Sequence, residues 1–405
     1  MATLPRQVTP VEGTVTVPRG FRAAGIHCGV KPDRPDLALI ASDAPASAAG
    51  TFTQIKTRSA PVIISEARLK SGRAQAVVIN SGNANACTGE QGFADARAMT
   101  AAAAAALGIP EDLVLVASTG VIGRPLPIDR ITQGMPRMVA ALGADGLAAA
   151  RAIMTTDAFV KTAAAQVDLG DGRVTIGGMA KGAGMIHPNM ATMIAVITTD
   201  AAVDPSVLRS GLRAAVNQTF NCISVDGDTS TSDSVFLLAN NASGLAPITA
   251  QDERYDAFVA GLMDVTGRLA RLVVQDGEGT TRVIEIAVRG ARADAEARLA
   301  GQAVMTSLLV KTAFHGAELN WGRIAAAVGR SGAEVDPDLL AIAIGEVWIV
   351  RDGVGVPETY PAAEPLLREP QVRVTIDLGL GQGQFTGWTS DLGESYVRIN
   401  SGYLS

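Results

Sequence analysis

The sequence predicts an α/β protein with a second, smaller α/β unit toward its C-terminus. Hydrophobic residues make up 47% of the 405 residues but aromatic residues only 4%, so the core must consist mainly of aliphatic and alanine side chains. In the first third of the chain, β-branched runs alternate with helices of small residues, as is typical of α/β folds. From about residue 285 to 405 the same alternation recurs in a smaller unit.

Four segments of the first third are expected to be strands. Residues 36–42 and 59–65 are apolar runs, and residues 73–89 and 113–123 are apolar runs that enter turns rich in Gly and Asn. Between the last two, residues 93–110 predict a helix that stops at Gly108 and Pro110.

The middle of the chain contains the segment that attracts most interest. Residues 146–166 predict a helix, followed over residues 167–178 by a strand pair with a tight turn. A Gly-rich loop and a Pro-Asn turn then lead into a β-branched run over residues 192–199, which predicts a strand. A helix over residues 204–220 and a strand over residues 232–241 are expected next.

Composition excludes several function classes. The net charge is −6 with no Lys/Arg-rich run, which argues against a nucleic-acid partner. The N-terminal segment has no apolar core of a signal peptide, and no stretch of 18 apolar residues occurs, so we expect a cytoplasmic protein without membrane contact. The few Cys and His residues show no CxxC or HExxH spacing, so we expect no metal site and no cofactor (Cys28, Cys87, Cys222, His27, His187, His315).

Thr192 stands where a chain break would make it reactive. A Thr hydroxyl is a poor nucleophile without a base. If the bond between Ala191 and Thr192 were cut, the new α-amine, with a pKa near ~7.7–8, would lie within reach of the Thr192 hydroxyl as a base. Gly182, Gly184 and Pro188 supply the turns such a loop needs. By themselves, these features fit a Gly-rich loop before an ordinary strand better than they fit a cleavage site.

The residues of this loop resemble a known family. KGAGMIHPNMATM, residues 181–193, resembles the cleavage segment of the bifunctional ornithine acetyltransferase/glutamate N-acetyltransferase family of arginine biosynthesis. Further blocks in family order are VVINSGNANACTGEQG, ASTGVIG, IMTTD, FNCISVDGDTSTSD, QDGEG, LVKTAFHG with NWGRI, and DLGESYVRIN. The resemblance covers the chain from about residue 20 to its end.

The resemblance implies an activity and its residues. In this family the chain cuts itself before the Thr, which then carries an acetyl group from N2-acetyl-L-ornithine to L-glutamate. Thr192 is thereby expected to be the nucleophile, and Thr119 with Gly120 the oxyanion hole. The expected substrate-binding residues are Thr155, Lys181, Thr192, Glu278, Asn400 and Ser405.

The resemblance also implies a fold and an assembly. The expected fold is an αββα sandwich of the self-cleaving DmpA/ArgJ-like type. Residues 1–191 would form an α chain and residues 192–405 a β chain, paired as an α2β2 heterotetramer. Partners would be small-molecule substrates. Some family members use acetyl-CoA as a second acetyl donor, and the sequence does not separate the two groups.

The chain departs from the family at three places. Ile55 stands in a segment that usually reads F-T-x-N, Glu318 and Leu319 stand where D-P is usual, and the final residues include Leu404. The cleavage segment and the oxyanion pair are unaffected, whereas substrate preference is open to change.

Other interpretations remain beside this one. An amidase or aminopeptidase with an N-terminal Thr nucleophile on a similar fold would pass the acyl group to water, and a binding protein would remain uncut. The loop over residues 225–233 has acidic and hydroxyl residues that suggest Mg or Ca but lacks the terminal Glu of an EF-hand, so a self-bonded turn is expected. GLGQGQ, residues 379–384, resembles a dinucleotide motif but precedes a strand-like run.

Overall fold

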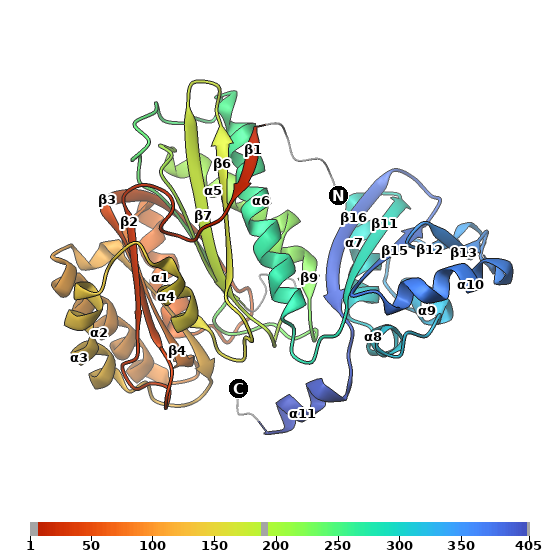
Figure 1. Cartoon of the computed structure of the whole chain (residues 1–405), viewed down its shortest axis with the longest axis horizontal. Coiled ribbons are helices and arrows are strands. Elements are labelled where there is room, and N and C mark those ends of the chain that lie inside the picture. The colour runs from red at the N-terminus through yellow and green to blue at the C-terminus, as the bar shows by residue number, and fades with distance from the viewer. Residues whose placement is uncertain (1–6, 188–192, 403–405) are drawn as a thin grey trace. The chain divides into compact units, whose positions relative to one another are not determined.

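The protein forms two compact units in the computed structural model, which describes residues 7–187 and 193–402 (Figure 1). The first unit runs to Asn221 and resumes over Asp228–Val273. The second unit consists of Cys222–Gly227 and of the chain from Val274 to the end of the last helix. No helix in these described stretches is both long and apolar enough to cross a membrane.

The first unit is built on one nine-stranded sheet. Its main path has the order β1-β6-β7-β8-β10-β3-β4-β5, and β2 pairs with β3 beside that path. The strands are β1 (Val8–Val11), β2 (Phe21–Ile26), β3 (Leu37–Phe52), β4 (Arg73–Asn83), β5 (Val114–Val121), β6 (Lys161–Asp168), β7 (Arg173–Lys181), β8 (Ile194–Thr199) and β10 (Ser234–Ala239).

Strand β3 joins two halves of this sheet. Its first part pairs with β2 and β4, and its last six residues pair with β10. One core cluster contains alternate residues from both halves, among them Ile40, Ile79 and Leu115 on one side and Val196 and Phe236 on the other. Because side chains alternate between the faces of a strand, the two halves must face each other across this cluster, which is therefore the inner core.

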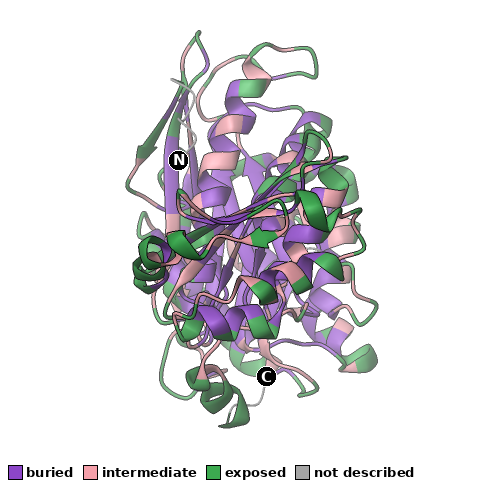
Figure 2. Ribbon diagram, turned by 90° about the vertical axis from the view of Figure 1, so that its right-hand side faces the viewer, coloured by how far each residue is buried: buried purple, intermediate pink, exposed green. Residues whose placement is uncertain are grey.

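Helices cover the outer faces of the doubled sheet. The opposite faces of β3, β4 and β5 pack against α1 (Ala60–Arg68), α2 (Gly89–Leu107) and α3 (Ile128–Ala140). On the other half, α5 (Pro205–Gln218) contacts β10 and β3, and α6 (Arg254–Gln275) lies so close to β7 that a Cβ on Gly178 would come 2.9 Å from a methyl of Leu269. These layers confirm the predicted αββα sandwich. Figure 2 shows that strands carry many of the buried residues, whereas the loops are mostly exposed.

The second unit is also α/β. Its sheet has the order β14-β13-β12-β15-β11-β16-β9. The strands are β9 (Ile223–Ser224), β11 (Val283–Ala291), β12 (Ala341–Ile344), β13 (Val347–Arg351), β14 (Val354–Gly355), β15 (Gln371–Asp377) and β16 (Gly383–Ser390). The helices are α7 (Asp294–Met305), α8 (Leu308–His315), α9 (Trp321–Gly329), α10 (Tyr360–Ala363) and α11 (Glu394–Gly402). The expected second α/β unit is thus present.

Two predicted elements differ from the structure. Residues 59–65 form the start of helix α1 rather than a strand, because Pro61 lies in the first turn, where its missing N–H costs no hydrogen bond. The helix expected over residues 146–166 ends at Ile153 as α4 (Gly146–Ile153), and residues 161–166 belong to β6. The alanines of β6 are extended because β1 and β7 pair with the strand on both edges.

The packing of the inner core leads to a testable prediction about stability. Phe236 is fully buried and meets Phe52 edge-on at 5.8 Å between ring centroids. Phe236→Ala should lower the free energy of unfolding of the first unit by about 3–5 kcal/mol, because it leaves a cavity between the two sheet halves. Val17→Ala, at a side chain that is 40% exposed, is the control and should change stability by no more than about 0.5 kcal/mol. Urea unfolding measures both, and equal effects would contradict the assignment of Phe236 to the core.

Candidate active site

The predicted oxyanion pair lies at the end of β5, beside the end of the parallel strand β4. In this register Thr119 pairs with Ser81 and Gly120 pairs with Gly82. Gly120 has φ of 131°, and a Cβ there would lie 2.4 Å from the carbonyl carbon of Gly82. Only glycine fits this position, because any side chain would collide with the neighbouring backbone.

Lys181 and Thr119 meet between the two sheet halves. Both side chains are buried, and Nζ of Lys181 donates a hydrogen bond of 3.3 Å to Oγ1 of Thr119. A hydroxyl that accepts from an ammonium group still has its own hydrogen to donate. Thr119 is thus set up as a hydrogen-bond donor, which is the role an oxyanion hole requires.

The sheet brings the start of β8 to the same place. Lys181, the last residue of β7, pairs with Ile194, the first residue of β8. Ile194 follows Thr192 by two positions, so the strand that would carry the nucleophile begins beside Lys181. Ala191 and Thr192 themselves lie outside the described residues, and their roles stay predictions.

A buried carboxylate organises the backbone around Lys181. Asp157 accepts hydrogen bonds from the backbone N–H of Thr155 at 2.8 Å, from the N–H of Gly182 at 2.7 Å, and from Nζ of Lys161 at 2.6 Å. Burial by itself would raise the pKa of Asp157, but the charges of Lys181 and Lys161 together with the hydrogen bonds hold that pKa well below its usual value. Asp157 is therefore a fixed negative charge that links Thr155 to the residue after Lys181.

Lys31 supports the same region from the N-terminal side. Its Nζ donates to the carbonyl of Pro35 at 3.0 Å and to the carbonyl of Met154, the residue before Thr155, at 2.5 Å. Burial, helped by the positive charges of Arg34 and Lys181 and opposed by nearby carboxylates, lowers the pKa of Lys31 to about 8. The buried ammonium groups of Lys31 and Lys181 therefore lie among buried carboxylates, and the charges of this region largely offset one another.

His187 is the histidine nearest in sequence to Thr192. Burial lowers its pKa below the usual value, and the charge of Asp228 opposes that shift. The imidazole of His187 is therefore neutral at neutral pH.

Glu278 and Asn400, two of the predicted substrate-binding residues, contact each other in the second unit. Nδ2 of Asn400, on α11, donates a hydrogen bond of 2.7 Å to Oε2 of Glu278. The next residue, Gly279, has φ of 74°, and a Cβ there would lie 2.6 Å from the backbone nitrogen of Tyr396. The turn that carries Glu278 and the helix that carries Asn400 are therefore in direct backbone contact. Ser405 lies outside the described residues.

Asp391 fixes the chain just before α11. Its carboxylate accepts from the backbone N–H groups of Thr281 and Arg282 at 2.8 and 2.9 Å, from the Thr281 hydroxyl at 2.6 Å, and bonds Nδ1 of His315 at 2.7 Å. Burial would raise the pKa of Asp391, but these bonds lower it, so the group is an anion at neutral pH. The start of α11 is thereby tied to the start of β11.

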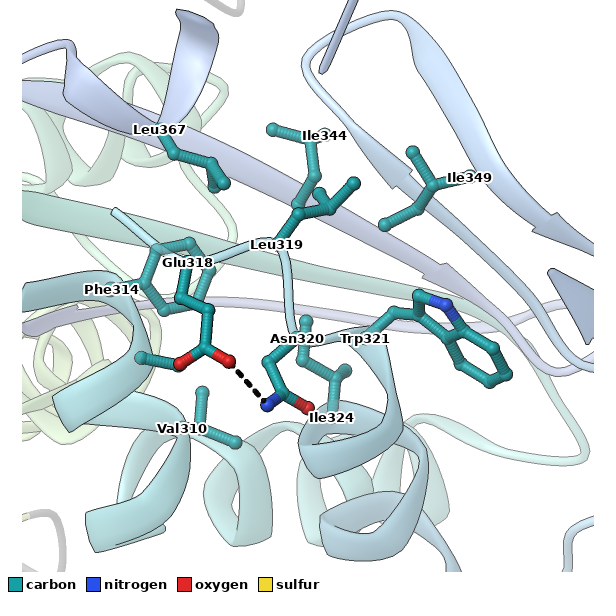
Figure 3. Close-up of a pocket in the computed structure, with 11 residues that line it drawn as sticks. Val310, Phe314, Glu318, Leu319, Asn320, Trp321, Ile324, Ile344, Ile349 and Leu367 are labelled. Atoms are coloured by element: carbon teal, nitrogen blue, oxygen red, sulfur yellow. Dashed lines mark hydrogen bonds between the residues drawn. The ribbon is translucent and has the colours of Figure 1, made fainter. Parts of the chain in front are cut away.

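Two of the departures from the family pattern, Glu318 and Leu319, lie together in the second unit. Glu318 and Leu319 line a small, mainly apolar pocket of the second unit, where Nδ2 of Asn320 donates to Oε1 of Glu318 at 3.2 Å (Figure 3). Ile55 is half-buried just beyond the end of β3. Leu404 lies outside the described residues. Because most of the pocket lining is apolar, the changes at Glu318 and Leu319 bear on packing of the second unit.

The acidic loop and the dinucleotide-like motif have structural explanations. In the loop over residues 225–233, the hydroxyls of Thr231 and Ser232 bond each other and Asp226 accepts from the Tyr396 hydroxyl. Nowhere in the described stretches do three His, Cys, Asp or Glu side chains gather so that they could hold a metal ion. Residues 379–384 lead into strand β16 and not into a helix.

Asp157, Lys161 and Lys31 are the supporting residues that sequence reasoning missed. Asp157 was visible only as the last letter of the block IMTTD, and its partner Lys161 follows four residues later in a different element. No periodicity joins them to Lys31, which is more than 120 residues away. Only the fold brings the three together.

Comparison with known proteins finds relatives that match nearly the whole chain. The ArgJ family matches residues 22–405. Proteins called arginine biosynthesis bifunctional protein ArgJ are 49% identical over 395 residues in Symbiobacterium thermophilum (96% of this chain, 98% of that protein) and 49% identical over 388 residues in Geobacter sulfurreducens (95% and 99%).

Solved structures are also similar. A chain of arginine biosynthesis bifunctional protein ArgJ from Bacillus halodurans is 44% identical, with a TM-score of 0.43 and coverage of 45% of this chain and 97% of that one. A chain of ornithine acetyltransferase complexed with ornithine, from Mycobacterium tuberculosis, is 42% identical, with the same TM-score and coverage of 45% and 98%. With matches over nearly its whole length, this chain belongs to the ArgJ family.

Proposed function

We propose that this protein is an acetyltransferase of arginine biosynthesis that cuts itself before Thr192. Thr192 would then accept the acetyl group of N2-acetyl-L-ornithine and pass it to L-glutamate, giving L-ornithine and N-acetyl-L-glutamate. The observation that carries the proposal is the bond from Lys181 to Thr119 beside the start of β8. Membership of the ArgJ family supports the substrates.

Each residue has a role that its surroundings suit. The α-amine of Thr192 would take the hydroxyl proton as Oγ1 attacks the acetyl carbonyl, and would return that proton to the departing ornithine nitrogen. The Thr119 hydroxyl and the Gly120 N–H would stabilise the negative oxygen of the tetrahedral intermediate. The acetyl ester on Thr192 would then be attacked by the glutamate amine, which restores the free hydroxyl.

Substrate binding would use the polar and charged residues that the resemblance implies. Lys181 would hold a carboxylate of the amino-acid substrate, because its buried ammonium group lies beside Thr119. Thr155 would contribute through a backbone that Asp157 fixes. Glu278, held by Asn400, would bind an amino group, and Ser405 would add a polar contact.

The same proposal covers cofactors and assembly. No cofactor is required, because the acetyl group travels on Thr192 alone. Acetyl-CoA as an additional donor would be detected by the acetyl mass it leaves on Thr192. The two fragments are proposed to stay together as an α2β2 assembly in the cytoplasm. Light scattering of the purified protein measures the mass of this assembly.

Self-cleavage is the first test. Wild-type protein should run on a denaturing gel as two fragments, residues 1–191 and 192–405, and the second should begin Thr-Met-Ile-Ala. Thr192→Ala should remain one inactive chain because the attacking hydroxyl is gone, whereas Thr192→Ser keeps a hydroxyl and should still cut. Cleavage at the same bond in the alanine variant would contradict the mechanism.

The acetyl-enzyme is the second test. Incubation with N2-acetylornithine should raise the mass of the 192–405 fragment by one acetyl group, and glutamate should remove it. Thr119→Ala should slow transfer about 100- to 1,000-fold with little change in KM, since an oxyanion donor acts in the transition state. Thr119→Ser, which keeps the hydroxyl, is the matched control.

Two results would overturn this part of the proposal. An unchanged turnover number for Thr119→Ala would remove Thr119 from the oxyanion hole. Acetyl loss to water faster than transfer to glutamate would make the protein an amidase. Should Thr119→Ala fail to cut itself, its cleavage rate takes the place of turnover, because the same donors would serve both steps.

The C-terminal helix provides the third test. Removing residues 400–405 deletes the bond from Asn400 to Glu278, and Asn400→Ala removes that bond alone. Each should lower kcat/KM roughly 10- to 100-fold, mainly through KM, as is typical for loss of a hydrogen bond to a charged group. Self-cleavage should be retained. Ser401→Ala, at an exposed position on the same helix, is the control, and normal kinetics in both altered proteins would show that the tail only packs.

A further inference from the structure

Asp233 lies beside the strand that would carry the nucleophile. It immediately precedes β10, which runs parallel to β8 with Ser234 paired to Ile194. The N–H of Ser234 donates to the carbonyl of Met193 at 3.1 Å, so Asp233 lies level with Met193. Met193 is the residue covalently joined to Thr192.

The carboxyl group of Asp233 is buried and unsatisfied. The residue is 2% exposed, and in the described part of the chain neither of its oxygens has a hydrogen-bond partner. The neighbouring hydroxyls are engaged elsewhere: Thr231 and Ser232 bond each other, and Ser230 accepts from the N–H of Ser232. Buried carboxyl groups without partners are rare, and each calls for an explanation.

Its electrostatic surroundings favour a neutral group. Burial raises the pKa of Asp233 well above its usual value. The backbone of Met193, the charge of Lys181 on β7 and the backbone of Ser230 lower it, although neither backbone group reaches hydrogen-bond geometry. In the single continuous chain these surroundings favour the protonated form of Asp233, which has no hydrogen-bond partner among the described residues.

Cleavage would create the missing partner. Hydrolysis of the bond between Ala191 and Thr192 consumes one water and leaves a carboxylate on Ala191 and an ammonium group on Thr192. That ammonium group has three N–H donors where the peptide had one, and it is one residue from Met193. A carboxyl group that is orphaned before the cut would face a cation after it.

We propose that Asp233 is the positioning residue that receives the α-amino group of Thr192 once the chain is cut. Asp233 becomes the carboxylate counter-ion of that amine and releases its own proton to solvent. It holds the amine so that the nitrogen lone pair faces the Thr192 hydroxyl whose proton it must take. The inference rests on the proposed self-cleavage, and it adds a residue outside the oxyanion hole and the substrate contacts.

The pH dependence of acetyl transfer is the direct test. A nearby carboxylate raises the pKa of an amine, and the positive charge of Lys181 acts against that effect. With Asp233→Asn, the acidic limb of the profile of kcat/KM against pH should move down by about one unit or more, because the amine loses its counter-ion. Asp95→Asn, which removes a buried carboxylate of α2 bonded to Gln91, should leave the limb in place.

Stability gives a second readout that does not need an active enzyme. In the uncut Thr192→Ala chain, adding Asp233→Asn should not lower the melting temperature, because the amide is a neutral equivalent of the orphaned acid. In the cut enzyme the same substitution should lower it, because an ion pair is lost. If Asp233→Asn blocks cutting, the melting temperatures of the uncut chains remain measurable, and a loss caused by Asp233→Asn there would contradict the proposal.

The outcomes separate this inference from the proposed function. An uncut wild-type chain, or one that never carries acetyl, would overturn the proposed function. A cut and active wild type whose acidic limb is unmoved by Asp233→Asn would overturn only the role of Asp233. A loss of melting temperature in the uncut background would do the same, since it would show that Asp233 already has a partner there.

Discussion

The buried charge of Asp157 is the interaction on which the geometry of the first unit's site depends. A carboxylate away from water is stable only if donors surround it. Asp157 meets that need with the N–H groups of Thr155 and Gly182 and the ammonium of Lys161. The end of α4, the start of β6 and the end of β7 are thereby held at one point. Lys181 emerges from this point and reaches Thr119 across the inner core.

The sequence predicted strand β8 and the strand that ends at residues 119–121 because their signals are local, whereas the catalytic roles proposed for them came from the resemblance. The β-branched run over residues 192–199 contains β8, and Gly120 lies near the end of β5. The αββα layering was expected only from the resemblance, since the sandwich depends on the pairing of β3 with strands of both sheet halves. Local patterns failed at residues 59–65, where tertiary packing and Pro61 favoured a helix, and in the alanines of β6, where ladder pairing on both edges outweighed helix propensity.

What could not be predicted is the set of long-range polar contacts. The bond from Lys31 to the carbonyl of Met154 joins segments more than 120 residues apart, and Asn400 finds Glu278 at a similar separation. Asp233 was part of a quoted block and was interpreted as a turn residue. Its lack of a hydrogen-bond partner among the described residues is visible only in the folded chain. Solvent access and hydrogen-bond satisfaction are properties of the folded chain.

The strand order of the first sheet has a consequence for a chain that has been cut. In the path β7-β8-β10-β3, the two middle strands follow residue 192 and the two flanking strands precede it. After cleavage, the ladders between β7 and β8 and between β10 and β3 would join two separate polypeptides. Strands of the two fragments would thus be interleaved in one sheet. Separating the fragments would require breaking the backbone hydrogen bonds of both ladders. Cutting must then follow folding, and the finished heterodimer would dissociate only by unfolding.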